Sequence, residues 1–230
     1  MMFSKFKKPT TKWMLLVSVV ILIAFGAFIG ISSCSRSSYF QLALDNLSET
    51  RMYMKHGEAE CCSAQFFAGM REEPYLVNGV SEKKVAFGII NLEPGKKIDG
   101  NELTGTLAIG EEILPVTLER NPHGANFATD IERLVDATQE LVLTLVIGGS
   151  THVFNLANAM PETAINWERA LEIAVDQMQP QIRKAGKFEC YVKIVESPVK
   201  GGGSFWYVRF VPEKGDNFFV VIDNTGRVIN

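Results

Sequence analysis

The chain has 230 residues, with 23 Lys and Arg against 26 Asp and Glu, and its pI is near 5.7. Because there is no basic excess, the sequence does not favour a nucleic-acid partner. An apolar content of 47% and a mean hydropathy of +0.08 are high for a soluble domain, and the excess of apolar residues lies near the N-terminus. After Ser35 the chain is acidic, with 19 basic residues against 26 acids.

An uncharged run extends from Trp13 to Ser35 and follows a tail, residues 1–12, that carries four lysines. About 20 apolar residues cross a hydrocarbon core of roughly 30 Å, so the run predicts a single transmembrane signal anchor at 13–35. Because cationic residues favour the cytoplasmic side, the tail is predicted to be cytoplasmic. The residues after position 36 are then predicted to lie outside the cytoplasm. The sequence thus predicts a bacterial envelope protein that is anchored in the cell membrane.

Two alternatives remain open for the same run. The residues Ile31-Ser32-Ser33-Cys34 resemble a bacterial lipobox, which implies lipidation of Cys34. The small residues Ser32 and Ser33 also permit cleavage of a simple secretory signal. All three interpretations place the body of the protein outside the cytoplasm.

The next segment, residues 36–58, is predicted to be a juxtamembrane helix. Phe40, Leu44 and Leu47 recur at helical spacing, with acids and Arg51 between them. This helix is expected to link the membrane to the first exterior domain.

Residues 59–158 are predicted to form an antiparallel β-sandwich of immunoglobulin-like type. Short apolar runs alternate with turn signals such as Gly110 and Gly148-Gly149, which mark two hairpins. A succession of about seven strands separated by such turns is typical of a sandwich. The runs are 64–70, 84–92, 103–109, 113–119, 126–131, 140–147 and 151–156.

Residues 159–230 are predicted to form a small α+β domain, so that the whole protein is mainly β. Asn166 is suited to cap a helix that ends near Met178, because Pro180 follows. Three strands are expected after the helix, at 188–195, 205–211 and 218–222.

The last part of this segment carries a family resemblance. The run 206–210 (WYVRF), followed by 219–228 (FVVIDNTGRV), resembles the end of PepSY and PepSY-like domains, and 167–174 (WERALEIA) is similar to the helix of that family. The three glycines at 201–203 depart from the pattern. The resemblance covers about residues 162–230 and implies a non-catalytic module, one that in secreted metallopeptidases belongs to the propeptide.

No motif in the sequence indicates catalysis, a cofactor or a metal site. The three histidines, His56, His123 and His152, have no metalloprotease spacing. For the vicinal Cys61-Cys62 and the distant Cys190, two states remain open: a bridge from one of the pair to Cys190, or reduced thiols. A soft-metal site at His56 and Cys61 lacks a fourth ligand in the sequence.

One surface is a candidate for protein contact. In a strand at 205–211, Trp206 and Val208 lie on one face, while Phe205, Tyr207 and Arg209 lie on the other. If the predicted helix covers the first face, the second face is available to a partner. The sequence therefore predicts a non-catalytic protein-binding module of the envelope, not an enzyme. The alternative is an anchored regulator or inhibitor of a secreted peptidase.

Overall fold

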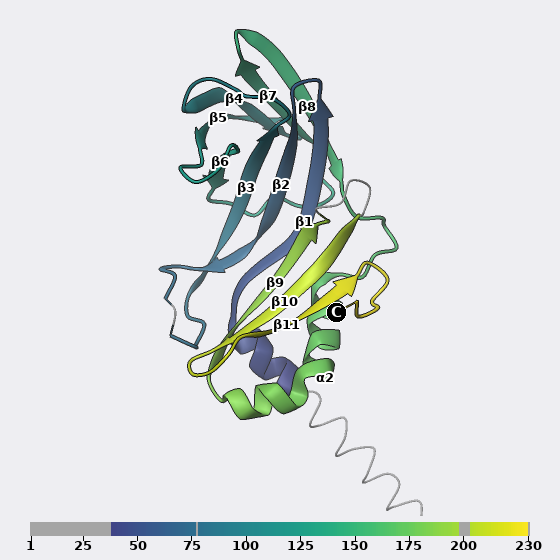
Figure 1. Ribbon diagram of the computed structural model, residues 1–230. Helices are drawn as coiled ribbons and strands as arrows, with labels where there is room; N and C mark the ends of the chain where they lie inside the picture. Colours follow the sequence, from purple (N-terminus) through teal and green to yellow (C-terminus); the bar gives the residue numbers. More distant parts are fainter. Residues whose placement is uncertain (1–37, 77, 198–202, 230) are drawn as a thin grey trace, which may run out of the picture.

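The computed structural model describes residues 38–76, 78–197 and 203–229 (Figure 1). Its strands form a single sheet in the order β11-β10-β9-β1-β2-β3-β6-β5-β4-β7-β8, and β8 also pairs with β1. The strands are β1 (Leu47–Ala59), β2 (Cys62–Glu72), β3 (Lys84–Pro94), β4 (Glu102–Ile109), β5 (Glu112–Arg120), β6 (Phe127–Ile131), β7 (Leu141–Ile147), β8 (Ser150–Asn158), β9 (Phe188–Glu196), β10 (Ser204–Pro212) and β11 (Phe218–Asp223).

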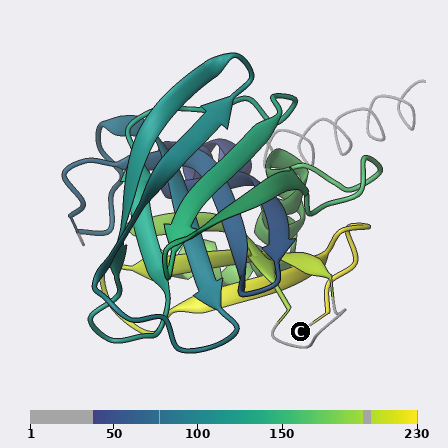
Figure 2. The ribbon, with the colours of Figure 1, turned by 90° about the horizontal axis from the view of Figure 1, so that it is seen from above.

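The pairing of β8 with β1 closes eight antiparallel strands into a barrel, which Figure 2 shows from above. Side chains that alternate along each strand fill its interior, among them the fully buried Phe66, Leu107, Phe127 and Phe154. The predicted sandwich is therefore wrong, although all seven strands predicted between residues 59 and 158 are present. Strand periodicity is the same in both architectures, and an eighth strand joins the two edges that a sandwich would leave open.

The two hairpins expected at Gly110 and at Gly148-Gly149 are confirmed. They connect β4 to β5 and β7 to β8. All three glycines have positive φ, between 58° and 82°, which is the conformation that tight hairpin turns demand and that side chains with a Cβ disfavour.

The eighth strand is β1, in a segment that the sequence predicted as helix. Only residues 38–45 are helical, and β1 begins at Leu47. The first half of β1 pairs in parallel with β9, and its second half pairs with β8 at Lys55 and His56. The prediction of a juxtamembrane helix over 36–58 is wrong beyond residue 45, because pairing with strands far along the chain overrides the local helical pattern.

A second hydrophobic core lies beside the barrel, where α2 (Trp167–Ala185) packs on one face of β9, β10 and β11 (Figure 1). Helix residues Ala170, Leu171 and Val175 meet Val192 and Val208 there. The strands and the start of the helix lie as predicted. The prediction of a separate PepSY-like α+β domain is wrong, because β9 pairs with β1 and so continues the sheet of the barrel.

The two ends of α2 differ in how well the sequence predicted them. Asn166 caps the start, its side chain accepting a hydrogen bond from the Arg169 amide, as expected. The end is not at Pro180, which lies inside the helix; α2 continues to Ala185 and stops at Gly186, where φ is 70°. Ile182, buried against the sheet, holds the turn that follows the proline.

The segment predicted as a transmembrane anchor, residues 13–35, lies outside the described residues, and so does Cys34. In the part of the chain that the structure describes, no helix combines the length and the apolar character needed to cross a membrane. The predicted transmembrane helix is thus not part of the architecture described here.

Gly69 is expected to be essential for the close approach of β1 and β2. A Cβ at this position would lie 1.7 Å from the Thr50 carbonyl oxygen, a backbone atom that cannot move without separating the strands. We expect Gly69→Ala to lower the free energy of unfolding of the full chain by about 3 kcal/mol or more, measured by urea denaturation. Ser63→Ala in the same strand is the control and should change it by less than about 0.5 kcal/mol. Equal stabilities of the two variants would contradict this role.

Pro180 is expected to weaken α2, because it removes a backbone hydrogen bond within the helix. Pro180 is exposed, so its replacement disturbs no packing. We expect Pro180→Ala to raise the free energy of unfolding by about 1 to 3 kcal/mol. Gln181→Ala, at the exposed neighbouring position, is the control for the change to alanine. A loss of stability in Pro180→Ala would show that the proline supports the helix end after all.

Candidate functional site

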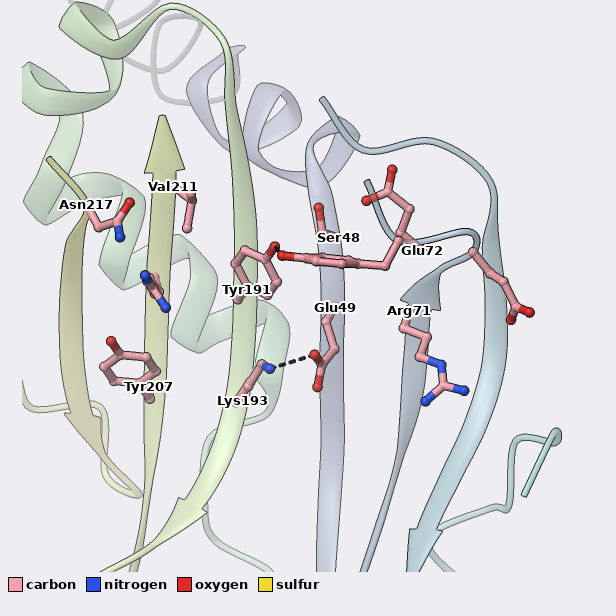
Figure 3. Close-up of a pocket in the computed structure, with 12 residues that line it drawn as sticks. Ser48, Glu49, Arg71, Glu72, Tyr191, Lys193, Tyr207, Val211 and Asn217 are labelled. Carbon is pink, nitrogen blue, oxygen red and sulfur yellow. Dashed lines mark hydrogen bonds and ion pairs between the residues drawn. The ribbon is translucent and has the colours of Figure 1, made fainter. Parts of the chain in front are cut away.

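A cleft of about 850 Å³ opens on the face of β9 and β10 that α2 does not cover (Figure 3). It extends from β10 across β9 and β1 to β2 and the segment that follows β2. The side chains that line it are mainly charged residues and tyrosines: Ser48, Glu49, Arg71, Glu72, Glu73, Tyr75, Tyr191, Lys193, Tyr207, Arg209, Val211 and Asn217.

Strand register arranges these side chains in rows across the sheet. Because side chains alternate between faces, residues directly opposite each other on neighbouring strands share a face. The first row consists of Phe219, Arg209, Tyr191, Glu49 and Arg71. The second row is displaced from the first by two residues on each strand and contains Tyr207, Lys193 and Arg51.

Glu49 is the central acid of the cleft and interacts with two cations. Its carboxylate lies 2.5 Å from Lys193 Nζ (Figure 3). It also lies 2.9 Å from Arg51 Nε. Burial raises the pKa of Glu49, but attraction and hydrogen bonds from Lys193 and Arg51 outweigh it, so the pKa lies below its ordinary value. Glu49 is therefore ionised at neutral pH and holds Lys193 and Arg51 in place.

Lys193 stands between attractive and repulsive neighbours. Burial lowers its pKa, Glu49 acts against this, and repulsion from Arg51 and Arg209 adds to the lowering. Its ammonium also lies 5.3 Å from the centre of the Tyr191 ring. The cation is thus held between the carboxylate of Glu49 and an aromatic ring.

Arg71 is fixed at the opposite side of the cleft. Its guanidinium lies 2.6 Å from Asp130 on β6 and 5.0 Å from the centre of the Phe87 ring on β3. An ion pair to one barrel strand and a contact with another leave this side chain with little freedom.

Arg209 differs from the other cations of the cleft. Within the described residues, its guanidinium has no hydrogen bond and no ion pair, although neighbouring arginines at 51 and 71 are both paired. The residues opposite Arg209 on the adjoining strands, Tyr191 and Phe219, carry no charge. The structure therefore brings a half-buried, uncompensated cation into the cleft.

A chain of hydroxyl groups supports one wall. Tyr191 donates its hydroxyl hydrogen to the carboxylate of Glu189, so the bond between the hydroxyls of Tyr75 and Tyr191 must use the hydrogen of Tyr75. Glu189 is fully buried and also accepts hydrogen bonds from the amides of Asn78 and Gly79, at 2.8 and 3.1 Å. Burial, together with the hydrogen bonds to Glu189 and Tyr75, raises the pKa of Tyr191, which keeps it a hydroxyl donor.

Two buried polar groups border the same cleft near the start of β1. Ser48 and Glu72 are only 1% and 2% exposed. Among the described residues, the Ser48 hydroxyl and one Glu72 carboxylate oxygen find no hydrogen-bond partner, while the other Glu72 oxygen accepts from the Glu82 amide at 2.9 Å. This end of the cleft is thus acidic, with Glu73 close by in the chain.

The residues predicted as a protein-contact face lie as strand alternation requires. Trp206 and Val208 are buried beneath α2, whereas Tyr207 and Arg209 line the cleft. Phe205 is half-buried and does not line it. Their role in protein contact stays a prediction. Glu49, Lys193 and Arg71 were not predicted, because only tertiary pairing brings them together and no local pattern marks them.

The three cysteines among the described residues are buried. Cys61, Cys62 and Cys190 are all free thiols. Cys190 lies opposite Leu47 at the start of β1, and Cys62 lies opposite Ala59 at its end, so about 40 Å of strand excludes a bridge between them. Burial raises the pKa of Cys62 to about 12 and also raises that of Cys190, so both remain protonated.

The histidines are separate from the cleft. His56 lies 3.6 Å from Glu196 and 3.8 Å from Glu58, and not beside Cys61, whose sulfur is instead 3.5 Å from His152 Nδ1. Among the residues with described positions, no group of three or more His, Cys, Asp or Glu has metal-site geometry.

Comparison with known proteins finds no matching family model, no matching curated protein and no matching solved structure. The resemblance to PepSY domains therefore stays a prediction based on the residues that carry it.

The ion pairs of Glu49 are expected to contribute to stability in a pH-dependent way. Since the folded pKa of Glu49 is depressed below 4.5, its contribution is present above about pH 4.5 and is lost as the pH falls through the folded value. We expect Glu49→Gln to lower the free energy of unfolding by about 2 kcal/mol at pH 7. The difference from wild type should shrink between pH 4.5 and pH 3.

Urea denaturation of the full chain across this pH range measures the effect. Glu119→Gln, at an exposed glutamate of β5, is the control and should follow wild type at every pH. A Glu49→Gln deficit that persists unchanged at pH 3 would contradict an electrostatic origin.

Proposed function

We propose that this protein is a non-catalytic binding module that holds an extended segment of a partner protein in the cleft on β9 and β10. The observation that carries the proposal is the composition of the cleft: a floor of paired charges, walls of tyrosine, and one arginine, Arg209, that no acid among the described residues compensates. The setting outside the cytoplasm is the one that the four N-terminal lysines predict.

The size and shape of the cleft suit a peptide segment. A volume near 850 Å³ lies at the upper end of the range for ligand sites, about 300–1,000 Å³. The row from Arg209 to Arg71 includes four strands, and the three spacings between them, at ~4.8 Å each, span about 14 Å. An extended chain covers this distance with about four residues.

The tyrosines support protein contact in particular. Tyr75, Tyr191 and Tyr207 border the cleft, and Tyr75 is 56% exposed. A tyrosine has an apolar ring and a polar hydroxyl with few rotatable bonds, so it contributes contact area at a small cost in conformational entropy. Tyr207 also packs on Phe219, with ring centres 5.4 Å apart, so its ring is held in position before a ligand arrives.

The pairing of the charged groups also supports a binding role. Glu49, Lys193 and Arg71 are engaged in short ion pairs, which hold them as fixed charges that a bound segment can contact. An inhibitory hold on a secreted peptidase, which the PepSY resemblance implies, is the special case in which the bound segment belongs to the peptidase.

Selection from a display library of random seven-residue peptides on the full chain tests the proposal. We expect enriched peptides to bind wild type and to lose at least about tenfold in affinity for Tyr207→Ser, because an aromatic anchor is removed from the cleft. Affinities are measured by fluorescence anisotropy.

The matched control is Val153→Ser, which changes a residue 51% exposed on β8 of the barrel and should leave the affinity unchanged. Failure to enrich any peptide, or equal affinity of all enriched peptides for wild type and Tyr207→Ser, would rule out the cleft as a peptide site.

A further inference from the structure

We propose that the cleft selects acidic segments, and that Arg209 binds a carboxylate side chain of the partner protein. This inference rests on the proposed function and specifies its ligand. It begins from the one cation of the cleft that no acid of the described chain compensates.

The neighbours of Arg209 explain why it is uncompensated. On its own strand the side chains two residues away are Tyr207 and Val211, and directly opposite lie Tyr191 and Phe219. None of these four is acidic. The strand positions that normally supply a cross-strand ion pair are therefore filled by aromatic and aliphatic groups.

The acids that share this face on β9 and β1 are already used by other groups. Glu189 lies diagonally from Arg209 on β9, but its carboxylate is fully buried and accepts hydrogen bonds from Tyr191 and from the amides of Asn78 and Gly79. Glu49 is two strands away and pairs with Lys193 and Arg51. Neither acid is free to turn to the guanidinium.

The local charge around Arg209 is positive. Lys193, Arg51 and Arg209 are three cations, against the two carboxylates of Glu49 and the buried Glu189, so cations outnumber acids in this part of the sheet. Burial lowers the pKa of Lys193, and repulsion from Arg51 and Arg209 adds to this lowering. A carboxylate placed here relieves that repulsion as well as pairing with Arg209.

The surroundings of Arg209 also fit a planar anion. A guanidinium presents parallel N–H groups that bind both oxygens of a carboxylate. Tyr207 and Asn217 line the cleft with hydroxyl and amide groups that can complete the hydrogen bonds. At the other end, Glu72 and Glu73 repel acids, so the acidic residue of the segment belongs over β10.

Three synthetic peptide pools test the inference on the full chain. Each peptide has seven residues, blocked termini and Glu, Gln or Lys at the central position, with Ala, Ser, Tyr and Val mixed at the others. Binding is followed by the anisotropy of a neutral fluorophore. We expect the Glu pool to bind wild type about tenfold to a hundredfold more tightly than the Gln pool, with a preference that shrinks as salt is added.

Variants at Arg209 assign the effect to this residue. In Arg209→Gln the Glu and Gln pools should bind equally, Arg209→Lys should keep part of the preference, and Arg209→Glu should prefer the Lys pool. Arg183→Gln removes an exposed arginine from α2, on the covered side of the sheet, and should behave as wild type. Circular dichroism confirms that each variant is folded.

The outcomes separate this inference from the function on which it rests. If the Gln pool binds wild type as tightly as the Glu pool, or if the preference survives in Arg209→Gln, carboxylate selection by Arg209 is overturned while peptide binding stands. If no pool binds wild type, both the binding function and its specificity are overturned.

Discussion

The architecture depends on one strand, β1, which pairs with three others. Along one edge it pairs with β2, and along the other it pairs first in parallel with β9 and then antiparallel with β8. The register is irregular between Leu47 and Glu49 and again between Arg51 and Tyr53. Such irregularities bend a strand and increase its twist, which lets β1 leave the small sheet and enter the barrel.

The position of the cleft follows from this shared strand. Because β9 continues the sheet beyond β1, the face that α2 leaves uncovered runs without a break from β10 to β2. Side chains separated by 144 residues, those of Glu49 and Lys193, thereby become neighbours on adjacent strands. A separate α+β domain would end at β9 and would lack the acidic half of the site.

Local chemistry predicted most of the strands but not how they join. Turn residues such as Gly110 and Gly148 mark hairpins that any β architecture can use, so they do not distinguish a barrel from a sandwich. In β1 the polar residues Glu49, Arg51 and Lys55 obscure the strand pattern, because their burial depends on partners elsewhere in the chain. Lys55, for example, is only 4% exposed and donates a hydrogen bond to the Gln139 carbonyl.

At the site, strand alternation placed Tyr207 and Arg209 correctly on one face, since the period of a strand is a local property. The positions of Lys193 and Arg71 in the cleft could not be predicted in this way, because they depend on the register between strands.

The barrel contributes to the cleft through Arg71. This arginine lies on β2, its carboxylate partner Asp130 lies on β6, and the ring beneath it, Phe87, lies on β3. Three barrel strands therefore fix one cation at the border of the cleft, while the pair of Glu49 and Lys193 fixes the middle. Placing these charges in a partly desolvated face costs free energy that apolar residues would not cost, so their presence is better explained by a defined pattern of charge than by stability. In that pattern, the cations paired with Glu49 and Asp130 form a fixed frame beside Arg209, which has no acidic partner among the described residues.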